Sequence, residues 1–260
     1  MNNRIDRLFA AKRRDILSVF FTAGFPELDS TVPVIRSLAA GGVDMIEIGV
    51  PFSDPMADGP VIQQSSTVAL RNGMTLKLLL AQVAEARRDV TGIPFVLMGY
   101  LNPMMQYGIE RLFRSCREAG IDALIIPDLP FDEYMRDFRP LCEQYDLPVI
   151  MLITPETSDE RIRRIDSMCD GFIYMVSAAA TTGTRDSFDS RQLDYFRRVD
   201  ALGLHHPRLI GFGISNPSTL KQAWGSSSGA IIGSLFVKCL TAETDTDAAV
   251  ARLRATLGLA

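Results

Sequence analysis

The chain contains 260 residues, 47% of them hydrophobic, and carries a formal net charge of −4. This length fits one large core and is close to the roughly 250 residues of a typical (β/α)₈ barrel. The acidic balance argues against a nucleic acid or another polyanion as partner. No apolar run approaches the roughly 18 residues that a membrane-spanning helix requires.

The N-terminal segment predicts a short amphipathic helix in which Ile5, Leu8 and Phe9 share one face. Charged residues interrupt the segment, so it lacks the continuous apolar region of a secretory signal. We therefore expect a cytoplasmic protein with an extra N-terminal helix.

Short apolar runs follow along the chain, and amphipathic stretches separate them. The runs are Val19–Ala23, Met45–Val50, Phe95–Tyr100, Ala123–Pro127, Val149–Ile153, Phe172–Val176, Leu209–Phe212 and Ala230–Ile232. They lack polar alternation, as expected of parallel strands that are covered on both faces. The stretches with helical periodicity include Thr31–Ala40, Leu76–Arg88, Ile109–Ala119, Glu133–Tyr145 and Asp159–Ser167.

The alternation of strands and helices indicates the α/β class. Eight strand-like runs favour a closed (β/α)₈ TIM barrel. No linker or composition shift divides residues 1–260, so we expect a single catalytic domain. A doubly wound open sheet is the second possibility, although no GxGxxG motif follows the first run.

The loop after the second run carries the acidic motif EIGVPFSDPMADGP, Glu47 to Pro60. Loops after strands form the active site in barrels of this kind. Glu47 lies inside the strand between Ile46 and Ile48, where a carboxylate must leave water. Either hydrogen bonds inside the barrel satisfy Glu47, or it is a general acid/base with a raised pKa.

Asp54 and Asp58 lie in the same long, proline-rich loop. Loop aspartates commonly bond only their own turn. A twice-acidic loop above a barrel mouth is also a natural source of a second catalytic carboxylate. Both interpretations stay open for these two residues from the spacing alone.

Small residues follow each of the last three predicted strands, in the segments Ser177–Arg185, Gly211–Ser215 and Gly233–Ser234. Glycine lets backbone N–H groups approach a ligand closely. A helix that begins at Ser234 presents oriented N–H donors and the positive end of its dipole. We therefore predict a phosphate site at these three neighbouring strand ends.

Four aromatic residues lie in or at the ends of predicted strands: Phe20, Tyr100, Tyr174 and Phe212. Any one of them is more typical of core packing than of ligand contact. Together, near the barrel ends, they suit a flat aromatic substrate.

Two kinds of residue pattern are missing from the sequence, and this narrows the possible reaction mechanisms. No lysine lies in a predicted strand, which disfavours a Schiff base. The only histidines, His205 and His206, are adjacent, and no second cluster accompanies them, so we expect no metal site. Carbon–carbon chemistry would then depend on carboxylates and on an electron sink within the substrate.

These motifs closely resemble the α subunit of tryptophan synthase. The resemblance is carried by the acidic motif, by FFTAGFP (Phe20–Pro26), Pro127–Pro130, TPETSDERI (Thr154–Ile162), GFGISNP (Gly211–Pro217) and Gly233-Ser234. It extends from about Ile5 to the C-terminal helix. The acidic motif is highly specific, whereas other phosphate-binding barrels share the glycine turns.

The resemblance implies a lyase that cleaves indole-3-glycerol phosphate to indole and glyceraldehyde 3-phosphate, with no metal or cofactor in the α subunit. It implies that Glu47 delivers a proton to indole C3 and assists removal of the glycerol hydroxyl proton. Asp58 would stabilise charge at the indole N–H. The implied phosphate-binding residues are Gly183, Gly213, Gly233 and Ser234, and the implied pocket residues are Phe20, Tyr100, Tyr174 and Phe212.

The family works with a separate β subunit that carries pyridoxal phosphate (PLP) and consumes the indole, so an α2β2 assembly is expected. The loops that match the partner contact contain Asp54, Asn102, Pro103 and Pro130. One departure is Ala178–Ala180, where the family usually has a glycine. Because alanine adopts a positive φ less readily, we expect this loop to close differently over the substrate.

Three alternatives stay open. A phosphoribosyl isomerase, an indole-glycerol-phosphate synthase or a pentose-phosphate epimerase would need another acid/base pair, a strand lysine or metal-binding histidines, and the last two are missing. A silent barrel that only regulates a β partner conflicts with the presence of Glu47 and Asp58. A stand-alone lyase that releases indole is not distinguished by the sequence.

Overall fold

The structure is a computed structural model that describes residues 3–177 and 187–259. Within these residues, eight parallel strands pair in chain order, and β8 pairs with β1 to close the barrel. The strands are β1 (Ile16–Thr22), β2 (Met45–Gly49), β3 (Phe95–Met98), β4 (Ala123–Ile125), β5 (Val149–Ile153), β6 (Ile173–Val176), β7 (Arg208–Gly211) and β8 (Gly229–Ile232). The predicted closed barrel is confirmed, and the open-sheet alternative is wrong.

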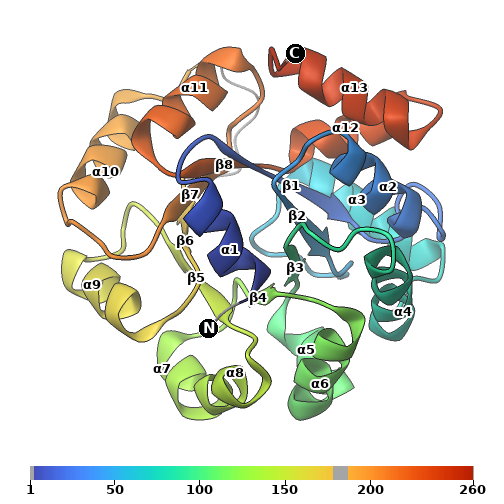
Figure 1. The fold of residues 1–260 in the computed structure, drawn as a ribbon, viewed down its shortest axis with the longest axis horizontal. Helices are drawn as coiled ribbons and strands as arrows, with labels where there is room; N and C mark the ends of the chain where they lie inside the picture. The colour runs from blue at the N-terminus through green and yellow to red at the C-terminus, as the bar shows by residue number, and fades with distance from the viewer. Residues whose placement is uncertain (1–2, 178–186, 260) are drawn as a thin grey trace.

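Helices surround the barrel, and α1 crosses one of its ends (Figure 1). The helices are α1 (Arg4–Ala11), α2 (Thr31–Ala40), α3 (Pro60–Arg71), α4 (Leu76–Arg87), α5 (Leu101–Tyr107), α6 (Ile109–Ala119), α7 (Phe131–Glu133), the π-helix η1 (Tyr134–Phe138), α8 (Arg139–Tyr145), α9 (Asp159–Met168), α10 (Ser190–Asp200), α11 (Pro217–Ser226), α12 (Ser234–Ala242) and α13 (Thr246–Thr256).

Some strand bounds differ from the sequence-based prediction. β1 begins at Ile16 rather than Val19, because Ile16 pairs with Gly229 of β8. β3 ends at Met98, and Tyr100 becomes the N-cap residue of α5. β7 ends at Gly211, because Phe212 has a φ of +70° and leaves the extended conformation.

The predicted helix Glu133–Tyr145 is interrupted by the π-helix η1. The helical path also begins earlier, at Phe131 of α7. Pro140 stands in the first turn of α8. Proline has no N–H for the bond to the residue four positions earlier, so the regular α-helical pattern cannot continue through it.

Two apolar clusters lie on opposite sides of the strands. The interior cluster includes Met45 of β2, Val96 of β3 and Tyr174 of β6. The outer cluster, under the helices, includes Ile46 and Ile48 of β2. This alternation turns Glu47 toward the barrel interior, because successive side chains of a strand point to opposite faces.

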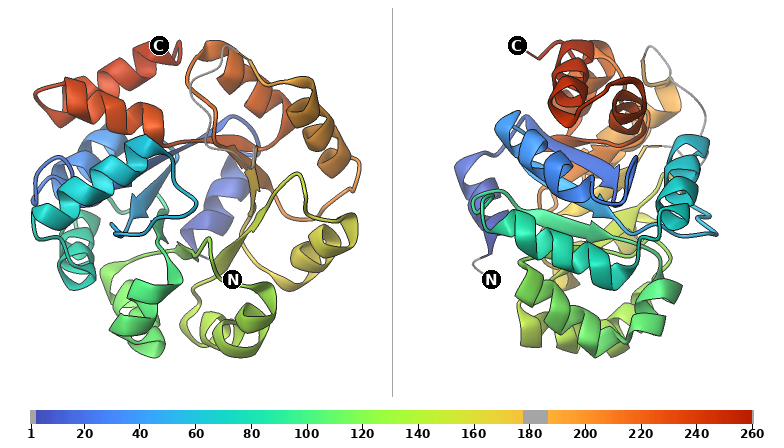
Figure 2. Two further views of the ribbon diagram at one scale, coloured as in Figure 1. Left: turned by 180° about the vertical axis from the view of Figure 1, so that it is seen from behind. Right: turned by 90° about the vertical axis from the view of Figure 1, so that its right-hand side faces the viewer.

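Helix α1 covers the end of the barrel where the strands begin. Ile5 is completely buried in the interior cluster, and Leu8 and Phe9 pack against it. The predicted apolar face of this helix is therefore confirmed. Figure 2 shows, in its 180° view, that α1 lies on the far side of the barrel from the segment that leads into α3.

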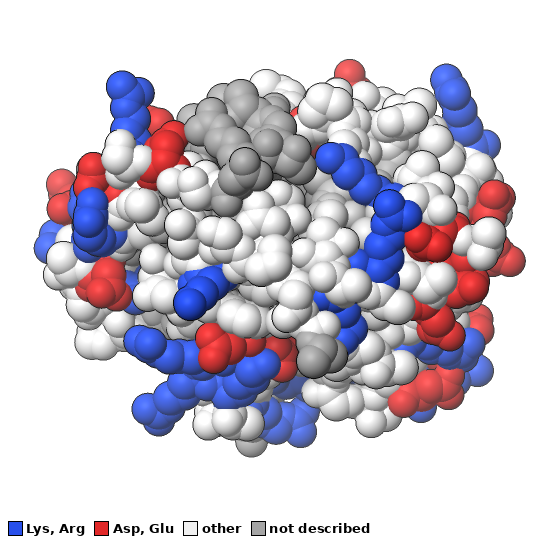
Figure 3. All heavy atoms as spheres, turned by 90° about the horizontal axis from the view of Figure 1, so that it is seen from above, with Lys and Arg blue, Asp and Glu red and all other residues white. Residues whose placement is uncertain are grey.

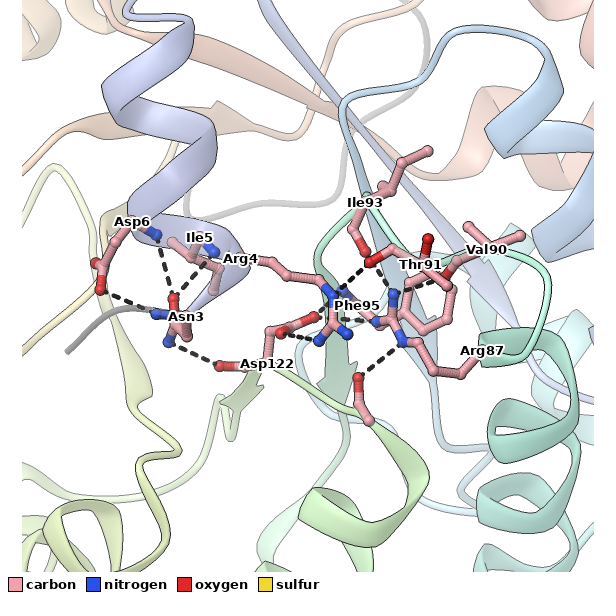
Figure 4. A network of polar contacts seen from close by, with 11 residues as sticks. Asn3, Arg4, Ile5, Asp6, Arg87, Val90, Thr91, Ile93, Phe95 and Asp122 are labelled. Atoms are coloured by element: carbon pink, nitrogen blue, oxygen red, sulfur yellow. Dashed lines mark hydrogen bonds and ion pairs between the residues drawn. The ribbon is translucent and has the colours of Figure 1, made fainter.

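Asp122 connects α1 to the barrel wall (Figure 4). Its carboxylate is 1% exposed and accepts hydrogen bonds from Arg4 Nη1 at 2.9 Å and Arg87 Nη2 at 3.0 Å. It also accepts from the backbone N–H of Phe95 at 2.9 Å. The Arg87 guanidinium lies 3.3 Å from the centroid of the Phe95 ring. Burial lowers the pKa of Arg87 to about 10, and the charge of Asp122 opposes this shift.

The surface carries charges of both signs, and basic and acidic side chains are interspersed on the face shown in Figure 3. Among the described residues, no helix has both the length and the apolar character needed to cross a membrane. Exposed ion pairs such as Arg136 with Asp137 contribute little to stability because water screens them.

We predict that Asp122→Ala lowers the free energy of unfolding by about 3 kcal/mol or more, because it leaves the buried cation of Arg87 without its partner. Urea unfolding followed by circular dichroism measures this change. The matched control is Asp137→Ala in the exposed Arg136–Asp137 pair, which should leave the midpoint unchanged. Equal midpoints for both variants would contradict the assigned role of Asp122.

Candidate active site

A cavity of about 600 Å³ opens at the carboxyl ends of the strands. It brings together residues that the sequence analysis took from separate segments. The predicted residues that line it are Phe20, Glu47, Asp58, Tyr174, Phe212, Gly213, Gly233 and Ser234. The position agrees with the general location of active sites in barrels of this class.

Glu47 is fully buried, and its side chain has one hydrogen-bond partner among the described residues. Ser18 Oγ of β1 donates to Glu47 Oε1 at 2.7 Å. The other oxygen, Oε2, has no partner there, although a buried polar atom normally has one. Burial raises the pKa of Glu47 from 4.5 to about 7, and the Ser18 hydrogen bond opposes the shift. Ser18 therefore holds one oxygen of the carboxyl, and the other oxygen is available to a ligand.

Asp58 lies at the cavity wall just before α3. Tyr100 Oη donates to Asp58 Oδ2 at 3.1 Å and accepts from the backbone N–H of Ala57 at 2.9 Å. Burial raises the pKa of Asp58 to about 6, and the hydrogen bond from Tyr100 opposes the shift. The loop that contains Asp58 is therefore fastened to the start of α5.

The two carboxylates have different environments, which fits them for different tasks. Glu47 is enclosed and has the higher pKa, so its neutral form is well populated near neutral pH. Asp58 is half-buried with the lower pKa, so it is mostly ionised at the same pH. Such separation of pKa values is typical of a general acid next to an anionic stabilising group.

Three of the predicted aromatic residues line the cavity, namely Phe20, Tyr174 and Phe212. Burial raises the pKa of the Tyr174 hydroxyl well above its ordinary value, and the charges of Glu47 and Asp58 add to the shift. Tyr174 and Phe212 meet edge to face, with ring centroids 6.4 Å apart. A Cβ at Gly211 would collide with the Tyr174 hydroxyl, so glycine is needed there.

Tyr100 occupies a different position from the other three aromatic residues. It is 6% exposed, packs its ring 5.2 Å from that of Phe52, and is not among the residues that line the cavity. Its hydroxyl donates a hydrogen bond to Asp58. A direct contact between Tyr100 and substrate stays a prediction.

The loops after β7 and β8 have the features of a phosphate site. Gly213 has a φ of +76°, a conformation that favours glycine, in the turn after β7. Gly233 is the N-cap residue of α12, and Ser234 is its first residue. The first N–H groups of a helix have no acceptor within it, and they attract anions. Gly183 and Ala178–Ala180 lie outside the described residues.

The sequence analysis missed several residues that line or support the cavity. Arg191 and Lys238 are the basic residues at its wall among those described. Lys238 lies four positions after Ser234 on α12, a spacing that places both on one helix face and was visible in the sequence. Ser18 was also detectable, as a lone hydroxyl in the apolar run before Phe20.

The residues predicted to meet a partner lie beside this mouth. Asp54, Asn102 and Pro130 are exposed, and Pro103 is half-buried. Hydrogen bonds connect their loops: Tyr100 bonds Ala57 and Asp58, and Leu101 N–H donates to Asp128 Oδ1 at 2.8 Å. The loops after β2, β3 and β4 therefore form one linked surface.

Comparison with known proteins identifies the family of this chain. The sequence profile of the family described as tryptophan synthase alpha chain matches residues 7–258. The chain belongs to the tryptophan synthase alpha chain family. The resemblance inferred from the acidic motif and the glycine turns is thus confirmed.

Individual alpha chains match over nearly their whole length. The tryptophan synthase alpha chain of Bacteroides fragilis is 56% identical over 257 residues, covering 99% of this chain and 97% of that protein. The alpha chain of Flavobacterium psychrophilum is 52% identical over 239 residues, covering 92% and 94%. The structure of the alpha subunit from Legionella pneumophila has a TM-score of 0.88 at 32% identity, covering 99% and 97%.

We predict that Glu47→Gln gains stability relative to the wild type as pH rises. The folded-state pKa of Glu47 is above the ordinary 4.5, so the folded protein retains its proton longer than the unfolded chain. The contribution of Glu47 to wild-type stability therefore falls by about 3 kcal/mol between pH 4.5 and about 7, and the variant lacks this contribution. Urea unfolding of both proteins at pH 4.5 and pH 8 measures the difference; a gap that does not change with pH would refute it.

Proposed function

We propose that Glu47 and Asp58 carry out in this chain the lyase reaction of tryptophan synthase alpha chains, the cleavage of indole-3-glycerol phosphate. The observation that carries the proposal is the buried carboxyl of Glu47, with one oxygen unpartnered and a pKa of about 7, at the wall of the cavity. A carboxyl in this condition is suited to proton transfer near neutral pH.

The reaction begins when neutral Glu47 delivers its proton to indole C3. The ring nitrogen becomes cationic, and ionised Asp58 stabilises the charge at its N–H. Glu47, now a carboxylate, takes the proton of the glycerol hydroxyl next to C3. The carbon–carbon bond breaks, its electron pair returns to the ring, and indole and glyceraldehyde 3-phosphate are released with Glu47 neutral again.

The cavity offers apolar contacts for one half of this substrate and polar contacts for the other. Phe20, Tyr174 and Phe212 supply the apolar wall for the flat indole. Gly213, Gly233 and Ser234 supply backbone donors for the phosphate, and Gly183 completes this set in the proposal. Lys238 and Arg191 at the wall add positive charge for the dianion.

The proposal includes a partner, a tryptophan synthase β subunit that holds PLP, in a cytoplasmic α2β2 assembly. Among the described residues, Met56 is 94% exposed and Met105 is 59% exposed. They lie near Asp54 and Asn102 in the linked loops beside the mouth. Exposed apolar side chains with adaptable shape are typical of binding surfaces. Asp54, Asn102, Pro103 and Pro130 are therefore assigned to this contact.

We also propose that residues 1–260 act as one catalytic domain. The pairing of β8 with β1 and the packing of α13 on α2 join the two ends of the chain. Removal of either end would therefore disturb the same barrel that holds Glu47.

We predict that the purified chain releases indole from indole-3-glycerol phosphate slowly, and at least about tenfold faster when a tryptophan synthase β subunit is added. Glu47→Gln should reduce the rate at least about 100-fold, because the general acid is lost. Asp137→Asn, in the exposed Arg136–Asp137 pair of η1, is the control. Release is followed by indole absorbance or by a colour reaction.

Fast release that β does not change would support a stand-alone lyase instead. Equal rates for wild type and Glu47→Gln would contradict the catalytic assignment. No release under either condition would favour a silent barrel that only regulates the partner.

A further inference from the structure

Ser177, directly after β6, joins two strand ends at the cavity. It is 1% exposed and lines the cavity. Its backbone N–H donates to Gly211 O at 3.1 Å, and its Oγ donates to Phe212 O at 2.8 Å. The hydroxyl therefore holds the peptide group that connects Phe212 to Gly213.

That peptide group lies in an unusual stretch of backbone. Phe212 and Gly213 have consecutive φ values of +70° and +76°. A positive φ is unfavourable for a bulky residue such as Phe and persists only where surrounding contacts enforce it. The edge-to-face contact with Tyr174 fixes the Phe212 ring, and the bond from Ser177 fixes its carbonyl.

Gln192 of α10 holds Ser177 in turn. Its Nε2 donates to Ser177 O at 3.2 Å, and it also lies 3.5 Å from Ser177 Oγ. Its Oε1 accepts from the backbone N–H of Asp189 at 2.9 Å, as part of the capping box that starts α10. The amide of Gln192 is therefore oriented by the helix start, and its donor side faces Ser177.

We propose that Ser177, oriented by Gln192, is a positioning residue that keeps the Phe212–Gly213 turn in the left-handed conformation that binds the substrate phosphate. This inference depends on the proposed function, because it assigns the phosphate of indole-3-glycerol phosphate to Gly213. With the carbonyl of Phe212 held by Ser177, the next N–H group, that of Gly213, is fixed in direction. The hydroxyl thus acts on the phosphate through the turn, without contact to the reacting carbon atoms.

A merely structural hydrogen bond and a positioning role predict different binding of the two products. Loss of a merely structural bond loosens the whole cavity and weakens indole and glyceraldehyde 3-phosphate equally. Loss of the positioning bond weakens the phosphate-bearing product more than indole, because the Gly213 N–H depends on the held carbonyl of Phe212. The Phe212 ring keeps its contact with Tyr174, and indole also contacts Phe20.

The test compares wild type with Ser177→Ala for the KM of indole-3-glycerol phosphate and for the dissociation constants of glyceraldehyde 3-phosphate and of indole. We expect Ser177→Ala to raise the KM and the glyceraldehyde 3-phosphate constant by about tenfold, because one buried hydrogen bond is lost. The constant for indole should change by less than about twofold, and kcat should fall less than KM rises.

The pair Ser177→Thr and Ser177→Val provides a matched comparison, since Thr and Val have similar shapes and only Thr retains the hydroxyl. The Ser177→Thr variant should bind glyceraldehyde 3-phosphate at least about fivefold more tightly than the Ser177→Val variant. Ser227→Ala is the control for loss of a buried hydroxyl. Ser227 Oγ lies within hydrogen-bond distance of two acceptors, Ala223 O at 2.9 Å and Gly229 O at 2.7 Å, where β8 begins, far from the cavity mouth. The Ser227→Ala variant should not weaken the binding of one product more than the binding of the other.

Equal weakening of both products by Ser177→Ala, or equal phosphate affinity of the Thr and Val variants, would overturn this inference. A wild-type chain that releases no indole and binds no glyceraldehyde 3-phosphate would overturn the proposed function itself. The two failures are therefore distinguishable by the behaviour of the wild type.

Discussion

The parallel pairing of β8 with β1 is the contact on which the rest of the structure depends. It closes the sheet, so all strands end at one mouth, and the side chains on the inner face share a single interior. An open sheet would leave Glu47 at a solvated surface with an ordinary pKa. At the opposite end, α1 buries Ile5 in the same interior and keeps water from entering there. The closure of the barrel is therefore also the cause of the raised pKa of Glu47.

Burial of Glu47 is unfavourable for folding and useful for chemistry. Its carboxyl loses hydration, and a single hydroxyl, that of Ser18, replaces part of it. The neutral form is favoured for this reason, and neutral Glu47 is the form that gives a proton to indole C3. Asp58 is less enclosed and receives a hydrogen bond from Tyr100, so it ionises first. The two carboxyls are chemically similar, but the fold leaves them different amounts of water. For this reason Glu47 serves as an acid and Asp58 as an anion.

Local sequence patterns predicted the elements that depend on local forces. The helix Thr31–Ala40 was predicted with its observed bounds, because its apolar periodicity is a local feature of the sequence. The start of β1 at Ile16 was missed, since it is fixed by pairing with a strand more than 200 residues later. Glu47 was found because a carboxylate inside an apolar run is conspicuous. Ser177 was named only as the start of a small-residue segment, and Gln192 was not found, because their contact depends on how β6 and α10 meet in space.

The closed barrel keeps a large share of Glu47 protonated near neutral pH. Isotope-edited NMR of glutamate side-chain carboxyl carbons tests it directly in the free chain, with Glu47→Gln identifying the resonance. We expect a titration midpoint of about 7 for this carboxyl. A midpoint near the ordinary 4.5 would contradict the role of Glu47 as the acid, because Glu47 would then be ionised in the resting site and unable to deliver a proton to the indole ring.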